Sequence, residues 1–210
     1  MPLNNIPAEY FRRQDEYSDF DFYRSPRLVA HIDDEAIAAL GQFLSPFIPE
    51  EAEVLDLMSA YLTHLPPDIQ ARCHRVVGLG MNAAEMAANT QLTDHVVHNL
   101  NEQPLFPFTD ASFDVALCTV SVQYLLHPVE VFAEVRRVLR PGAPFLVSFS
   151  NRCFPTKATA LWLNTNDTQH TELISLYFAE SGGWSNVQTA DISPMPNRSD
   201  PLFVVVGRRV

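Results

Sequence analysis

The chain has 210 residues, which is typical of a single domain. Its 47% hydrophobic and 19% charged residues indicate a globular protein with a packed core and exclude a mainly disordered chain. The formal net charge of -11 repels phosphate backbones, and basic residues cluster no further than pairs such as Arg12-Arg13. Nucleic acid is therefore not an expected partner.

The termini and the cysteines predict a cytoplasmic protein. The first residues, MPLNNIPAEYFRRQDEY, lack the apolar segment of a signal peptide, and no apolar run reaches the roughly 18 residues of a membrane span. We therefore expect no membrane partner. Cys73, Cys118 and Cys153 lie too far apart for a redox or zinc motif, and the histidines are better explained as core or surface residues, so no metal site is predicted.

Strand and helix patterns alternate along the chain. Apolar residues at helical spacing predict helices over 35–44, 82–89, 128–140 and 171–180, the second with a capping box from Asn82 to Glu85. Short apolar runs predict strands at 54–57, 76–79, 95–98, 113–118 and 145–149, followed by two more near 186–192 and 202–207. This order favours an α/β fold with three layers, in which helices cover both faces of a mainly parallel sheet.

The predicted sheet places a possible binding site at one edge. Ligands of such sheets bind outside the carboxyl ends of the strands. That rule puts residues 56–60, Gly80, Asn99 and residues 119–121 on one rim. The aromatic-rich start of the chain, with Tyr23, Arg24 and Arg27, is either a lid over this rim or a segment that packs against the sheet.

Two motifs give the chain a family resemblance. The stretch LFPFTDASFD at 105–114 and the stretch EVRRVLRPG at 134–142 closely resemble class I S-adenosylmethionine-dependent methyltransferases of the type 11 group. The resemblance covers about residues 50–150. It implies a Rossmann-like three-layer sandwich with a seven-stranded, mostly parallel sheet and an antiparallel last strand. It also implies a methyltransferase that uses S-adenosylmethionine and acts on a small molecule or a protein.

Within this scheme residues 1–49 are expected to form a helical and aromatic cap segment, and residues 50–210 the methyltransferase-like part of one structural domain. The resemblance assigns cofactor binding to residues at the ends of the first four strands. They are Asp56, Met58, Ser59, Ala60, Gly80, Met81, Asn99, Leu100 and Thr119. Methyl transfer needs no universal base, so the catalytic residues stay unassigned. Tyr23, His31, Asn151 and Arg152 are candidates on the substrate side.

The cofactor motif departs from the family pattern at two places. Three glycines that normally follow the first strand are replaced by Met58, Ala60 and Leu62. Because a side chain disfavours positive φ, we expect the loop to take another path or to leave a narrower cleft. Gly80 stands where the family usually has an acid that accepts both ribose hydroxyls. The stretches LDLMS at 55–59 and HLP at 64–66 resemble a subgroup that shares this altered loop.

Two other functions stay open. The altered motif is also compatible with a methyltransferase-fold protein that binds or regulates without catalysis. The stretch GLGMNA at 78–83 matches G-x-G-x-x-A, which is typical of NAD(P)-binding oxidoreductases. That fingerprint normally follows the first strand of its unit, however, and here it follows the second predicted strand.

Overall fold

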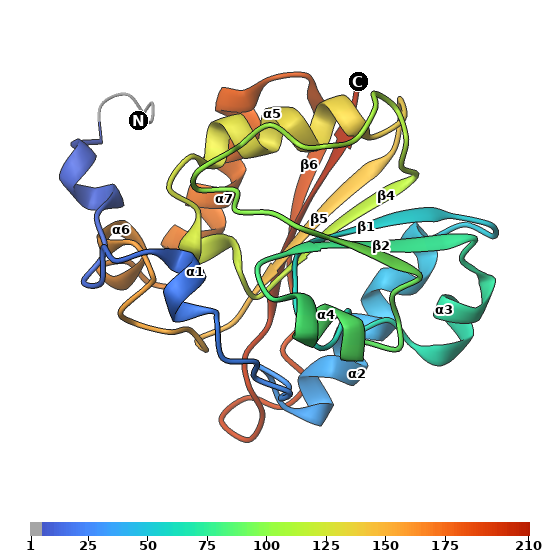
Figure 1. Ribbon diagram of the computed structural model, residues 1–210, viewed down its shortest axis with the longest axis horizontal. Helices are drawn as coiled ribbons and strands as arrows, with labels where there is room; N and C mark the ends of the chain where they lie inside the picture. The colour runs from blue at the N-terminus through green and yellow to red at the C-terminus, as the bar shows by residue number, and fades with distance from the viewer. Residues whose placement is uncertain (1–5) are drawn as a thin grey trace.

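The computed structural model describes residues 6–210, and its centre is a seven-stranded sheet of order β3-β2-β1-β4-β5-β7-β6 (Figure 1). The strands are β1 (Glu53–Ser59), β2 (Arg75–Gly80), β3 (Asp94–Val97), β4 (Val115–Thr119), β5 (Pro144–Phe149), β6 (Trp184–Asp191) and β7 (Phe203–Arg209). The first five run parallel, and β7 pairs antiparallel with both β5 and β6. The predicted α/β fold with an antiparallel last strand is confirmed.

Helices cover both faces of the sheet (Figure 1). On one face lie α2 (Asp34–Leu44) and α3 (Pro67–Arg72), whose Leu40 and Ile69 share a buried cluster with Val54 of β1. On the other face lie α5 (Pro128–Val138) and α7 (Asp167–Ser181), which bury Phe132 and Phe178. The central strands are therefore buried on both sides, and this explains why they read as continuous apolar runs.

The remaining helices are short and lie near the sheet edge that carries the strand ends. They are α1 (Asp19–Phe22), α4 (Ala83–Ala88) and α6 (Ala160–Leu163). Asn82 caps α4 by accepting from the backbone N–H groups of Ala84 and Glu85 at 2.9 and 3.1 Å. The predicted capping box is only half formed, because the Glu85 carboxylate accepts from the Arg27 N–H instead of reaching back to Asn82. The hydrogen bond between Arg27 and Glu85 therefore joins the N-terminal segment to α4.

Several predicted boundaries need correction. Helix α3 was not predicted, because two prolines, Pro66 and Pro67, are usually read as a break in helical structure. In the structure they begin the helix: Pro66 precedes it and Pro67 takes the first helical position, where proline is tolerated. Helix α7 begins at Asp167 and not at residue 171, because a full capping box of Asn166 and Gln169 starts it earlier. Strand β4 begins at Val115, and Phe113 makes only an isolated bridge with Leu139.

No helix within residues 6–210 is long and apolar enough to cross a lipid bilayer. The predicted division at residue 49 stays a prediction. Residues 1–5 of the proposed cap segment lie outside the described part of the chain.

Candidate functional site

A cavity of about 300 Å³ lies at the carboxyl ends of the parallel strands. This is the lower end of the size range of small-molecule pockets. All nine residues that the sequence assigned to cofactor binding line it: Asp56, Met58, Ser59, Ala60, Gly80, Met81, Asn99, Leu100 and Thr119. Strands β1, β2 and β4 and the turn after β3 thus bring these residues to one place, as the strand-end rule predicts.

Met58 occupies the first of the replaced glycine positions and has a φ of 57°, in the left-handed region that favours glycine. The side chain at this position therefore does not exclude positive φ, although it makes that conformation costly. A residue with a side chain in this conformation costs roughly 1–2 kcal/mol, which the surrounding structure must supply. Met58 is half-buried, and its side chain packs against the core cluster between the sheet and α5. The packing of the Met58 side chain thus helps to offset the cost of its left-handed backbone conformation.

Gly80 lies in unusually close contact with the end of β1. The pairing of β1 with β2 shifts register between Leu57 and Ser59, so Ser59 pairs with Gly80. A Cβ atom on Gly80 would lie 2.0 Å from the Ser59 carbonyl oxygen. The position that carries the ribose-binding acid in the resembling family therefore accepts no side chain in this backbone geometry.

Asp56 supplies a buried carboxyl group to the cavity, with only 3% of its surface exposed. The hydroxyls of Ser59 and Thr63 donate to its Oδ2 atom at 2.5 and 2.9 Å. Burial raises the pKa of Asp56 to about 7, and the two hydrogen bonds oppose this rise. The group therefore changes charge near neutral pH.

The turn after β3 forms the opposite wall. Asn99 is buried, and its Oδ1 atom accepts from the backbone N–H of Asn101 at 3.0 Å. One lone pair of the amide oxygen is thus in use, while the other is free to accept from a ligand. Asn101 in turn donates to the Asp19 carboxylate at 3.0 Å. This contact links the wall to the N-terminal segment.

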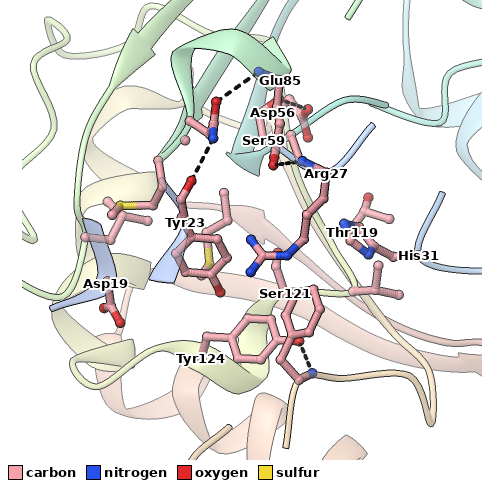
Figure 2. Close-up of a pocket in the computed structure, with 18 of the residues that line it drawn as sticks. Asp19, Tyr23, Arg27, His31, Asp56, Ser59, Glu85, Thr119, Ser121 and Tyr124 are labelled. Carbon is pink, nitrogen blue, oxygen red and sulfur yellow. Dashed lines mark hydrogen bonds between the residues drawn. The ribbon is translucent and has the colours of Figure 1, made fainter. Parts of the chain in front are cut away.

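The N-terminal segment crosses the cavity and is held at both sides. On the α4 side, Asn82 donates to the Tyr23 carbonyl at 2.6 Å, and the Arg27 N–H donates to Glu85 at 2.6 Å (Figure 2). On the other side, the fully buried Lys157 ammonium lies 3.3 Å from the carboxylates of Asp15 and Asp19. The segment therefore contributes to the cavity lining and is anchored on two sides, and its role as a lid stays a prediction.

Arg27 lines the cavity, although no separate role was predicted for it. Its guanidinium lies over the rings of Phe22, Tyr23 and Phe154, with centroid distances of 4.7, 5.8 and 5.2 Å. Figure 2 shows its side chain extending from the Glu85 side toward Tyr23, Ser121 and Tyr124. A lone arginine outside any motif carries no sequence signal for such a position.

Three of the four substrate-side candidates reach the cavity: Tyr23, His31 and Arg152 line it, and Asn151 does not. Burial raises the pKa of the Tyr23 hydroxyl and lowers that of the His31 imidazole, so both groups are neutral near pH 7. Arg152 is paired with Asp200 at 2.7 Å.

His64 is a further buried group at the cavity wall. Both of its ring nitrogens are buried without a hydrogen-bond partner in the described part of the chain. Burial, with a smaller contribution from His31, lowers the pKa of His64 to about 4. The imidazole is therefore neutral at pH 7 and offers one donor and one acceptor.

Sheet order, antiparallel last strand and strand-end cavity together define the class I methyltransferase fold. Residues 59–147, which are less than half of the chain, match a family model described as a methyltransferase domain. A solved structure from Pyrococcus horikoshii OT3 superposes with a TM-score of 0.63 at 16% identity, covering 90% of this chain and 99% of that one. A methyltransferase from Aquifex aeolicus gives a TM-score of 0.61 at 16% identity, over 84% and 92% of the two chains.

A malonyl-[acyl-carrier protein] O-methyltransferase from a Marinomonas species is 18% identical over 126 residues, covering 60% of this chain and 46% of that protein. The chain thus spans less than half the length of the curated relatives that it matches. In this segment and in its fold, the chain is similar to class I S-adenosylmethionine-dependent methyltransferases.

The oxidoreductase alternative is not favoured. Gly78 and Gly80 both lie inside strand β2, not in a loop between a strand and a helix. A Cβ atom on Gly78 would lie 2.6 Å from the Leu92 side chain. These glycines serve close packing within the sheet and do not form a loop that could cradle a pyrophosphate.

Proposed function

We propose that the protein is an S-adenosylmethionine-dependent methyltransferase that acts on a small molecule or a protein. One observation carries the proposal. The residues assigned to the cofactor by family resemblance line a single cavity, and Met58 in its lining has the left-handed conformation that favours glycine. Backbone strain of this kind is retained mainly where the local geometry has a use.

The residues present fit the cofactor in part. Asp56, Ser59 and Ala60 would hold the methionine and ribose portion, and Asn99 and Leu100 would hold the adenine. No carboxylate can stand at Gly80, so two charge-assisted hydrogen bonds to the ribose are missing from that position. We therefore expect the cofactor to bind with micromolar or weaker affinity.

The cofactor, when bound, supplies a methyl group on a sulfonium ion. The protein positions the reactants and excludes water, which is the main requirement of an in-line displacement. Tyr23, Arg27 and His31 of the N-terminal segment line the cavity, and this segment would exclude water. Tyr23, His31 and Arg152 remain the substrate-side candidates, and no catalytic residue is assigned.

A small acceptor agrees best with this arrangement, because the cavity, which residues of the N-terminal segment help to line, has a volume of about 300 Å³. Among the relatives is also a sterol 4-C-methyltransferase of Caenorhabditis elegans, 33% identical over 75 residues, and this supports an acceptor other than nucleic acid. The net charge of -11 disfavours nucleic acid as well. A cytoplasmic location remains our proposal.

Calorimetry with S-adenosylmethionine, S-adenosylhomocysteine and NAD tests the proposal. We expect the first two to bind and NAD to show no heat of binding. A labelled methyl donor incubated with candidate acceptors then tests transfer. Tight NAD binding without any response to the methyl donor would overturn the proposal.

A second candidate is a binding or regulatory protein with this fold and no catalysis. The contact between Ser59 and Gly80 favours it, because that contact fills the place of the ribose-binding acid. Binding of S-adenosylhomocysteine with no transfer to any acceptor tried would support this second candidate.

A further inference from the structure

Arg27 is distinguished from the other cations at the cavity by the lack of a carboxylate partner. Arg13 is paired with Asp19 at 2.7 Å, and Arg152 is paired with Asp200. Within residues 6–210, Arg27 makes no ion pair with any carboxylate. Its positive charge is therefore not neutralised by direct contact.

The guanidinium is also incompletely hydrogen-bonded. Its Nη2 atom donates to the Phe22 carbonyl at 3.0 Å, whereas its Nη1 atom is buried and has no hydrogen-bond partner among residues 6–210. A buried donor without a partner costs free energy, and the cost is larger for a charged group. A ligand atom that accepts from Nη1 would remove this cost, so the cavity is prepared for an acceptor group at this point.

The position of the side chain is fixed by its surroundings. Its backbone N–H is held by Glu85, and its planar group is held by the rings of Phe22, Tyr23 and Phe154. Contacts of a cation with aromatic faces are attractive and orient the guanidinium. Little conformational freedom is then left to lose when a ligand binds, which favours affinity.

We propose that Arg27 binds the carboxylate of a ligand in this cavity, and that the methyl acceptor is a small carboxylic acid with an aromatic or apolar body. Only one part of this inference rests on the proposed methyltransferase function, namely that the carboxylate ligand is the methyl acceptor. The planar guanidinium matches a carboxylate through parallel hydrogen bonds. In a protein of net charge -11, an anionic ligand needs such a local cation.

The carboxylate that Arg27 binds has a second possible origin, because the methionine portion of the cofactor also carries one. The location of the guanidinium favours the acceptor. It contacts Phe154, in the segment after β5, and rings of the N-terminal segment, whereas the predicted cofactor residues lie at the ends of β1, β2 and β4 and after β3.

The test uses Arg27→Met, which removes the charge, and Arg27→Lys, which keeps the charge but lacks the planar group. Arg24→Met is the matched control, because Arg24 lies three residues away with a side chain that is 77% exposed and pairs with Asp21. Thermal unfolding first establishes that all variants are folded. The acceptor arm titrates 3-phenylpropanoate and its neutral amide, with and without saturating S-adenosylhomocysteine. The cofactor arm compares S-adenosylhomocysteine with 5′-methylthioadenosine, which lacks the carboxylate.

We expect Arg27→Met to lower the affinity for 3-phenylpropanoate at least tenfold, Arg27→Lys to lower it less, and Arg24→Met to leave it within twofold. If instead only the affinity for S-adenosylhomocysteine falls tenfold and that for methylthioadenosine does not, Arg27 binds the cofactor's carboxylate. The proposal is overturned if neither arm separates the Arg27 variants from the control. Absence of S-adenosylhomocysteine binding by the wild type would refute the proposed function, while the 3-phenylpropanoate arm on the free protein would still decide the role of Arg27.

Discussion

Asp56→Asn removes the buried carboxyl group at the end of β1 and preserves its shape. Burial raises the pKa of Asp56 from 3.8 to about 7. Because the folded-state pKa is the higher one, the folded protein holds this proton more tightly than the unfolded chain does. The stabilisation is fully present below pH 4 and is lost as the pH rises to about 7. Each pH unit in that window corresponds to about 1.4 kcal/mol, so the step from pH 5.5 to pH 7 removes about 2 kcal/mol.

An asparagine is not subject to this loss. The hydroxyls of Ser59 and Thr63, which now donate to the carboxylate, would donate to the amide oxygen. Urea unfolding of both proteins at pH 5.5, 6.5, 7.5 and 8 measures the effect. We expect the free energy of unfolding of Asp56→Asn, relative to wild type, to increase by about 2 kcal/mol over this range and to level off above pH 7.5.

Asp68→Asn serves as the control for replacing a carboxyl group by an amide, because Asp68 is exposed at the start of α3. The reasoning fails if the difference between Asp56→Asn and wild type does not change from pH 5.5 to pH 8. That result would mean that the Asp56 carboxyl ionises at its ordinary pKa, and that the cavity base is solvated and not buried.

Further predictions concern the same strand ends. In urea unfolding, Met58→Gly should be about 1 kcal/mol more stable than Met58→Ala, because glycine relieves the left-handed strain. Ala60→Gly should be about 0.5–1 kcal/mol less stable than wild type, because glycine loses more conformational freedom on folding. Gly80→Asp should lose about 3 kcal/mol, seen as a lower Tm, because its Cβ atom collides with the Ser59 carbonyl. In calorimetry, affinity for S-adenosylmethionine relative to S-adenosylhomocysteine should rise several-fold from pH 6 to pH 8, since ionised Asp56 attracts the sulfonium cation. The double change Met58→Gly with Ala60→Gly should weaken binding of both ligands.

The sequence predicts the sheet well because its central strands are buried on both faces. Val54 and Leu55 of β1 point to opposite faces and pack in two different clusters, so an uninterrupted apolar run is the only pattern compatible with this position. Edge elements carry less signal. Helix α3 has one fully buried residue, Ile69, and no periodic apolar stripe could indicate it.

The candidate site is predictable where backbone topology places residues and is not predictable where side chains meet across the chain. Asp56 and Asn99 follow from the positions of their strands. Arg27 depends on contacts with Glu85 and Phe154, which lie 58 and 127 residues away along the chain, and local sequence does not encode such contacts. The left-handed conformation of Met58 is likewise not encoded locally, because the packing that holds this one residue outweighs a general steric preference.

The two departures from the family motif meet at one backbone contact. The left-handed residue Met58 lies at the register shift of β1, and this shift brings Ser59 opposite Gly80. Once the Ser59 carbonyl is there, any side chain at position 80 is excluded, including the ribose-binding acid. The missing acid therefore follows from the path of β1. The same bend places the Ser59 hydroxyl on Asp56 and keeps a polar, ionisable group at the strand end. A strand end that closes off position 80 and retains this buried carboxyl group argues for a modified binding pocket.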